Sequence, residues 1–242
     1  MKAIAVIPAR LASTRLPGKM LREIDGRPLI GRVYEAVRSS SLLDDVIVAT
    51  DSQEIMQVCT HNGWRVQMTS ATHRSGTERV HEVANSLVLA DYEVYLNVQG
   101  DEPLTRAEHI AVLIEVMKNP RVQVGTLKTP CSGADINNPN AVKVVTDAAG
   151  RALYFSRATI PHDRDATGAR YFKHLGFYAY RKPALERFVA LPESSLERSE
   201  QLEQLRFLEN GICIHVGETA YDTVGVDTEE DLRRVEEILR RR

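Results

Sequence analysis

Short apolar runs alternate with longer stretches of helical periodicity through the first half of the chain. The apolar runs predict strands at residues 3–7, 45–50, 65–68 and 94–100. The stretches between them repeat apolar residues at helical spacing and predict helices at residues 28–40, 51–63 and 76–87. Because the strands are uniformly apolar, we expect an α/β fold whose mostly parallel sheet is sandwiched by helices.

Residues typical of helix ends support these helices. Pro28 lies near the start of the first helix, where its missing N–H leaves no hydrogen bond unmade. Asp51 is the candidate N-cap of the second helix, and Gly63 is suited to end it. Ser75 or Thr77 is suited to cap the third helix.

The pattern changes after about residue 120, where short strands follow one another with little helix between them. The strands are predicted at residues 122–129, 141–146, 152–155, 177–180 and 212–216, with a loop at 165–174. Helices are predicted at residues 183–192, 194–211 and 228–241, the last capped by Asp227 or Thr228 with Glu230 as the capping-box partner. We expect one domain over 1–242, with a nucleotide-binding core at about 1–120 and 205–242 and a smaller mixed sub-lobe at about 121–204.

Composition narrows the class of protein. The net charge of −2 does not favour a nucleic-acid partner, because such proteins usually carry a strong basic excess. The three cysteines are widely spaced and include no CxxC pair, which favours free thiols in a reducing compartment over disulfides or structural zinc. No apolar run is long enough to insert into a membrane, and Pro8 and Arg10 interrupt the N-terminal one, so we expect no signal peptide and a cytoplasmic protein.

The loop at residues 8–19 is the strongest functional signal. It follows a buried strand directly and combines small or turn-forming residues with Arg10, Arg15 and Lys19. Backbone N–H groups of such a loop approach phosphate oxygens closely, and its cations add charge, with Lys19 suited to a more distal phosphate. The loop matches neither the GxxxxGK[ST] nor the GxGxxG pattern. The alternative is a solvated basic loop.

Two carboxylates follow apolar runs at distant points of the chain. Asp101 lies in NVQGDEP and Asp227 in VGVDT. Mg²⁺ prefers one or two carboxylates together with phosphate oxygens, so both aspartates could converge on one ion beside a nucleotide triphosphate. Each could instead be a simple helix cap, which is how we interpret Asp51.

Other polar groups lie within apolar segments. The segment 73–79 offers hydroxyls and exposed backbone that suit a base or ribose, although its spacing fits a capped helix start equally well. Further candidates for holding an acidic, hydroxyl-rich substrate are Arg157, His174, Tyr178, Glu203 and Gln204. A lone histidine in such a run is more often a hydrogen-bonded core residue than a ligand.

Together these segments resemble the 3-deoxy-manno-octulosonate (Kdo) cytidylyltransferases. The resemblance extends through nearly the whole chain and rests on the order of IPARLASTRLPGK, VATD, SGTER, NVQGDEP, NPNAVKVV, ALYFSRATIP, KHLGFYAYR, LEQLRFLENG and GVDTEEDL. It implies a nucleotide-diphospho-sugar transferase fold of the glycosyltransferase-A kind. It also implies CTP and Kdo as substrates, Mg²⁺ as cofactor, a homodimer and a role in lipopolysaccharide biosynthesis.

The resemblance assigns roles to residues by position. The catalytic set is Arg10, Lys19, Asp101 and Asp227, of which both aspartates are the metal ligands. The nucleotide-binding set is Pro8, Ala9, Arg10, Ser13, Arg15, Lys19, Arg74, Ser75 and Gly76. The sugar-binding set is Gln99, Arg157, His174, Tyr178, Glu203 and Gln204.

Related activities remain as alternatives. A cytidylyltransferase for 8-amino-Kdo, an N-acylneuraminate or methylerythritol phosphate would share the basic loop and the metal aspartates. The segments YFSRATIP and LEQLR fit the Kdo enzymes better. A nucleotide sensor without catalysis on the same fold would tolerate loss of Asp101 or Asp227, whereas both are present here.

Overall fold

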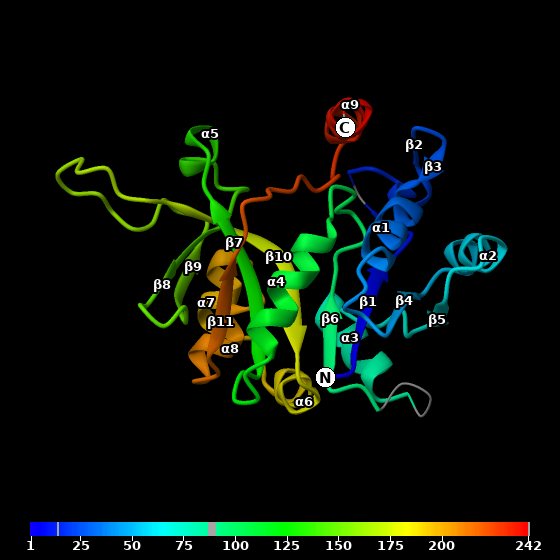
Figure 1. The fold of residues 1–242 in the computed structure, drawn as a ribbon, viewed down its shortest axis with the longest axis horizontal. Coiled ribbons are helices and arrows are strands. Elements are labelled where there is room, and N and C mark those ends of the chain that lie inside the picture. Colours follow the sequence, from blue (N-terminus) through cyan, green and yellow to red (C-terminus); the bar gives the residue numbers. More distant parts are fainter. Residues whose placement is uncertain (14, 87–90, 242) are drawn as a thin grey trace. The chain divides into compact units, whose positions relative to one another are not determined.

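The computed structural model describes residues 1–13, 15–86 and 91–241, which form two compact units (Figure 1). The first unit comprises residues 1–111 and 223–242, and the second comprises residues 112–222. Helix α4 (Ala107–Met117) spans the division between them and was not among the predicted elements. The predicted nucleotide-binding core and sub-lobe are functional assignments and stay a prediction.

A parallel sheet forms the centre of the first unit. Its strands lie in the order β6 (Val94–Asn97), β1 (Ala3–Ala9), β4 (Asp45–Thr50) and β5 (Val66–Met68). Strands β1, β4 and β6 are buried along nearly their whole length, as uniformly apolar strands predict. The prediction for β6 was too long, because residues 98–100 leave the strand and form part of a loop.

Helices pack against this sheet and connect its strands (Figure 1). They are α1 (Leu29–Arg38), α2 (Gln53–His61) and α3 (Gly76–Ala84). The unit also contains a short 3-10 helix, η1 (Lys19–Leu21), a hairpin of β2 (Glu23–Ile24) and β3 (Arg27–Pro28), and the C-terminal helix α9 (Glu229–Arg240), which contacts β2. Ser75 caps α3 by accepting a hydrogen bond from the Glu78 N–H, as predicted. Leu87, at the end of the predicted helix 76–87, lies outside the described residues.

One predicted cap, Asp51, was wrong, whereas Thr228, one of the two residues predicted to cap the last helix, is confirmed as its N-cap. Ser52, not Asp51, is the N-cap of α2, and its hydroxyl accepts from the Ile55 N–H. At α9 the capping box joins Thr228 to Asp231, so Asp227 and Glu230 have no capping role there. The carboxylates of Asp51 and Asp227 are therefore available for ion pairs.

A small apolar core fixes the C-terminal segment of the first unit. Leu232 and Val235 of α9 pack with Val226, just before the helix, and with Leu16 of the basic loop. Burying each such side chain contributes about 1.5–3 kcal/mol relative to leaving it exposed. Packing of α9 thus fixes both the basic loop and the segment that carries Asp227.

The second unit contains the mixed strands. Strands β11 (Ile214–Glu218) and β7 (Val124–Pro130) pair in parallel. Strand β10 (Phe172–Tyr180) pairs antiparallel with β7 and with β8 (Lys143–Thr146), and β8 pairs antiparallel with β9 (Ala152–Ser156). Strand β10 begins earlier than predicted and includes residues 172–174 of the expected loop. The α/β fold with mostly parallel strands flanked by helices is confirmed.

One predicted helix of the second unit is interrupted. Residues 194–211 form α7 (Ser195–Glu200) and α8 (Leu205–Glu209), separated at Gln201, whose φ of 53° is left-handed. The remaining helices are α5 (Gly133–Ile136) and α6 (Lys182–Ala190). The apolar periodicity continues across the break, which is why it predicted a single helix.

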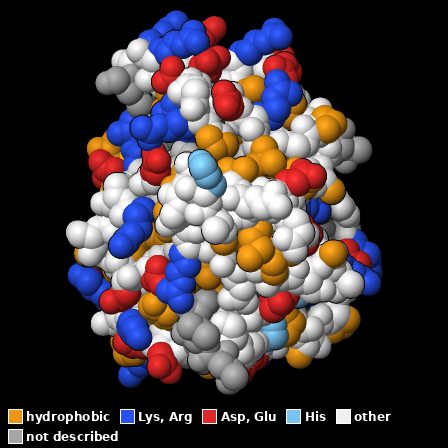
Figure 2. All heavy atoms as spheres, turned by 90° about the vertical axis from the view of Figure 1, so that its right-hand side faces the viewer, with side chains coloured by type: hydrophobic (Ala, Val, Ile, Leu, Met, Phe, Trp, Pro, Cys, Tyr) orange, Lys and Arg blue, Asp and Glu red, His pale blue; other side chains and the backbone are white. Residues whose placement is uncertain are grey.

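Acidic and basic side chains are interspersed on the face drawn in Figure 2. This mixture agrees with the small net charge of the chain. Among the described residues, no helix is long and apolar enough to cross a membrane.

Candidate active site

A cavity of about 610 Å³ lies in the first unit, where β1 and β6 end. This volume is within the range typical of small-molecule sites. Its wall contains every residue of the predicted nucleotide-binding set: Pro8, Ala9, Arg10, Ser13, Arg15, Lys19, Arg74, Ser75 and Gly76. Gln99, Asp101 and Asp227 also line it. Residues from four separate stretches of sequence therefore meet at one edge of the sheet, the edge at which α/β proteins bind ligands.

Lys19 lies at the centre of the charged groups in this cavity. Its Nζ is 2.6 Å from Asp101 Oδ2, 3.0 Å from Asp227 Oδ1 and 3.1 Å from the Val226 carbonyl oxygen. Burial lowers the pKa of the ammonium, but the two carboxylates outweigh that effect and raise the pKa above its ordinary value. Lys19 is therefore a charged donor that links both aspartates.

Backbone contacts bring the two aspartates together. The Val226 N–H donates to the Asp101 carbonyl oxygen at 2.9 Å, which aligns the segment before α9 with the loop after β6. Gly18, with φ of 63°, turns the basic loop into η1 and directs Lys19 toward both carboxylates. Arg15 Nη2 lies 2.9 Å from the second oxygen of Asp227. The sequence predicted that Lys19 and Arg15 bind phosphate. In the structure Lys19 bonds Asp101 and Asp227, and Arg15 bonds Asp227.

The donor set suits a divalent cation. Asp101 and Asp227 approach one nitrogen at hydrogen-bond distance, so the same pair of carboxylates is close enough to share a metal ion. Within the described residues, no group of three or more His, Cys, Asp or Glu side chains gathers as a complete metal site. Two carboxylates completed by substrate oxygens and water is the arrangement that Mg²⁺ favours.

The segment 73–76 forms another part of the cavity wall. Gly76 packs so closely that a Cβ there would lie 3.3 Å from Asn97 Nδ2 and 3.4 Å from Pro8 Cγ. The amide of Asn97 is fully buried, and neither its nitrogen nor its oxygen has a hydrogen-bond partner in the described part of the chain. A buried amide without a partner is costly, so Asn97 is a candidate site residue.

Sequence reasoning missed several residues of the wall. Met20, His73 and Arg79 line the cavity and were not predicted as site residues. Arg79 is the arginine of the SGTER segment, so its place in that motif could have marked it as a site residue. Asn97 belongs to NVQGDEP, but nothing in the sequence marks it as buried without a partner.

The predicted sugar-binding residues other than Gln99 belong to the second unit. His174 on β10 bonds Thr126 Oγ1 through Nε2 at 2.9 Å, and its ring lies against Phe155 and Tyr178. Burial lowers the pKa of His174 to about 3, which keeps it neutral. Tyr178 is buried and stacks on Tyr180.

The other members of the set lie near the interrupted helix. Arg157 Nε donates to the Glu200 carbonyl oxygen at 2.8 Å, and Arg157 Nη1 donates to the Pro139 carbonyl oxygen at 3.1 Å. Glu203 and Gln204 lie between α7 and α8, where Gln204 is buried. Within the second unit, Arg157 thus contacts Glu200 and Gln201 at the end of α7.

An α/β sheet with a cation-rich loop after its first strand and two convergent aspartates defines the class as a nucleotide-binding enzyme fold. A family model described as cytidylyltransferase matches residues 4–218. A 3-deoxy-manno-octulosonate cytidylyltransferase from Koribacter versatilis is 69% identical over 100% of this chain and 92% of its own length. One from Acidobacterium capsulatum is 55% identical over 99% and 97%. The chain belongs to the family of 3-deoxy-manno-octulosonate cytidylyltransferases, which confirms the resemblance seen in the sequence.

Solved structures agree with this membership. A CMP:2-keto-3-deoxy-manno-octonic acid synthetase complexed with CTP is 42% identical, with a TM-score of 0.94 over 100% of this chain and 99% of that one. A 4-diphosphocytidyl-2C-methyl-D-erythritol synthase from Anaerococcus prevotii has a TM-score of 0.65 over 99% of this chain and 96% of that one. At 18% identity the second likeness shows the fold alone.

Proposed function

We propose that this chain transfers CMP from CTP to Kdo and releases pyrophosphate, for lipopolysaccharide biosynthesis. One observation carries the chemistry: Asp101 and Asp227 converge on Lys19 in a cavity that also contains the basic loop. Relatives of this name at up to 69% identity and a CTP-bound neighbour of closely similar fold support the choice of nucleotide and sugar acid.

The basic loop would bind the triphosphate. Its backbone N–H groups and Arg10 supply donors, and Arg10 and Lys19 neutralise charge that develops on the leaving pyrophosphate. The segment 74–76 would contact the cytidine. Holding CTP in this way favours in-line attack by the anomeric hydroxyl of Kdo on the α-phosphorus, so the chain contributes mainly by positioning and charge neutralisation.

Asp101 and Asp227 would hold a divalent cation, for which we propose Mg²⁺. When bound, such an ion neutralises phosphate charge and lowers the pKa of a coordinated hydroxyl. The carboxylates would orient that ion, and Lys19 Nζ lies within hydrogen-bond distance of both of them. Gln99, Arg157, His174, Tyr178, Glu203 and Gln204 are proposed to bind the sugar acid, and a cytoplasmic homodimer is proposed on the family resemblance.

Pyrophosphate release by the purified full chain with Mg²⁺ and CTP tests the proposal. Kdo, 8-amino-Kdo and N-acetylneuraminate are compared as acceptors, and the proposal expects release with Kdo. Preference for 8-amino-Kdo or N-acetylneuraminate would retain the nucleotide chemistry and replace the sugar. No release with any acceptor, from protein that binds CTP, would favour a nucleotide sensor. Sedimentation analysis of the same preparation tests the homodimer.

A further inference from the structure

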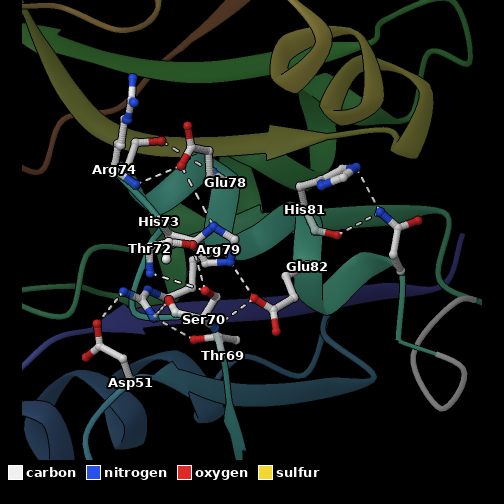
Figure 3. Close-up of polar contacts among 12 residues, drawn as sticks. Asp51, Thr69, Ser70, Thr72, His73, Arg74, Glu78, Arg79, His81 and Glu82 are labelled. Carbon is white, nitrogen blue, oxygen red and sulfur yellow. Dashed lines mark hydrogen bonds and ion pairs between the residues drawn. The ribbon is translucent and has the colours of Figure 1, made fainter.

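An ion pair between a buried arginine, Arg79, and a partly buried aspartate, Asp51, lies at the cavity of the first unit (Figure 3). Arg79 Nη2 is 2.9 Å from Asp51 Oδ2, and Arg79 Nη1 is 2.6 Å from Thr69 Oγ1. The Arg79 side chain is only 5% exposed. Because burying charges costs desolvation free energy, such a pair is better explained by the geometry it fixes than by stability alone.

The partners of Arg79 come from three elements. Asp51 follows β4, Thr69 follows β5, and Arg79 itself lies in α3, one turn after Ser75. Arg79 Nη1 also donates to the Ser70 carbonyl oxygen at 3.3 Å. The planar guanidinium thus joins the ends of two strands to the helix whose first turn lines the cavity.

Two carboxylates of α3 hold the same segment, residues 69–76, hereafter the nucleotide loop. Glu78 Oε2 accepts from the Arg74 N–H at 2.7 Å. Glu82 Oε2 accepts from the Ser70 N–H at 2.9 Å and contacts His73 Nε2. In Figure 3 these side chains extend from α3 toward the nucleotide loop, so one helix sets the path of the loop through several charge-assisted bonds.

The nucleotide loop forms part of the cavity wall, so its position sets the shape of the cavity there. His73, Arg74, Ser75 and Gly76 all line the wall, as does Arg79. Gly76 packs close to Asn97 and Pro8, because a Cβ there would lie 3.3 Å from Asn97 Nδ2 and 3.4 Å from Pro8 Cγ. A shift of the loop by a few tenths of an ångström would therefore change the part of the wall that faces the nucleoside.

We propose that Arg79, held by Asp51, is a positioning residue for nucleoside recognition. Arg79 fixes the nucleotide loop so that Arg74, Ser75 and Gly76 contact the cytidine half of CTP. The basic loop binds the triphosphate independently of Arg79. The inference rests on the proposed function, since it takes CTP as the ligand.

The test compares Arg79→Lys and Asp51→Asn with a matched control, Asp45→Asn, in the full chain. Asp45 pairs with Arg65 at the opposite ends of β4 and β5, away from the cavity wall. We measure the dissociation constants of CTP and of inorganic tripolyphosphate with Mg²⁺, together with hydrogen exchange of the 70–76 amides. Loss of the charged contact between Arg79 and Asp51 predicts CTP binding weaker by about 10–100-fold.

The expected result is weaker CTP binding and faster exchange at 70–76 in both cavity-side variants, with tripolyphosphate binding within about twofold of the parent. Asp45→Asn should leave all three readouts unchanged. Unchanged CTP binding in folded Asp51→Asn would overturn the inference even if Arg79→Lys failed to fold. An equal loss of CTP and tripolyphosphate would also overturn it. Failure of the parent chain to bind CTP would instead overturn the proposed function.

Discussion

The ammonium nitrogen of Lys19 lies 2.6 Å from an Asp101 carboxylate oxygen, although 82 positions separate the two residues. The same nitrogen lies 3.0 Å from Asp227, near the other end of the chain. A single side chain thus brings together two carboxylates that belong to different loops. The chemistry proposed for the cavity depends on this convergence.

Removing either aspartate should abolish most turnover. We expect Asp101→Ala and Asp227→Ala each to lower kcat by about 100-fold or more, because a preorganised charge partner is lost. The measurement is pyrophosphate release at saturating CTP, Kdo and Mg²⁺. Glu229→Ala is the matched control, since Glu229 lies two residues further on and pairs with the exposed Arg22. Near-normal turnover in either aspartate variant would exclude the metal assignment.

Lys19→Met should bind CTP more weakly and turn over more slowly, because a cation is lost from the triphosphate site. It should also leave two adjacent carboxylates without their shared cation. Mg²⁺ alone should then raise the melting temperature of the variant more than that of the parent, because ligand binding to the folded state stabilises it. Equal Mg²⁺ shifts in the two proteins would show that Lys19 and the metal do not share these carboxylates.

Gly100→Ala should disturb the packing of the cavity wall at Gly100 and Pro8. A Cβ at this position would lie 2.8 Å from the Pro8 carbonyl oxygen, which is backbone and cannot rotate away. We expect a loss of about 1–3 kcal/mol in the free energy of unfolding, measured with urea, and weaker CTP binding. Gly133→Ala is the control, since a Cβ at Gly133 would meet nothing within 4 Å and the φ of this residue is not positive. Equal effects of the two substitutions would contradict the close contact.

The neutral state of His174 should make stability depend on pH. Burial lowers the pKa of His174 to about 3 in the folded chain, whereas the pKa of an unfolded histidine is about 6.5. Between these values the unfolded chain binds a proton that the folded chain does not. The stabilisation is therefore complete above about pH 6.5 and is lost as the pH falls toward 3.

Urea unfolding at about pH 7.5 and about pH 5 measures this dependence. The parent should lose more free energy of unfolding between the two conditions than His174→Gln, which has no titrating ring. The comparison concerns the change with pH, because the variant also alters the contact with Thr126 and differs in absolute stability. The same loss in both proteins would mean that His174 is not held neutral by burial.

Sequence patterns predicted the parts of the fold that depend on local chemistry. Uniformly apolar runs identified β1 and β4, and cap and stop residues identified the ends of α2 and α3 near Gly63 and Ser75. The break at Gln201 was missed because helical periodicity persists on both sides of it. Strand β10 was predicted too short because its first residues, from Phe172, are polar or only partly buried.

The sequence likewise predicted the cavity residues that lie in local motifs but not the long-range contacts between them. The residues proposed to bind the nucleotide could be placed at the cavity because the basic loop directly follows a strand and the remaining segments match a family by motif. The partners of Asp51 and Asp227 could not be predicted, because an aspartate after a strand has the same local sequence whether it caps a helix or joins an ion pair. Arg79 and Lys19 decide between these roles, and both are distant in sequence from the carboxylates they contact.

The sequence by itself determined most strands and helices, the family, and many of the residues that line the cavity, since each follows from local periodicity or from short motifs. Only the tertiary structure decided that Lys19 links Asp101 to Asp227, that Arg79 joins Asp51 to Thr69, and that the Asn97 amide is buried beneath Gly76. These are long-range contacts set by the packing of α3 and α9. The free energy of a buried charge or amide depends on which groups that packing brings within hydrogen-bond distance.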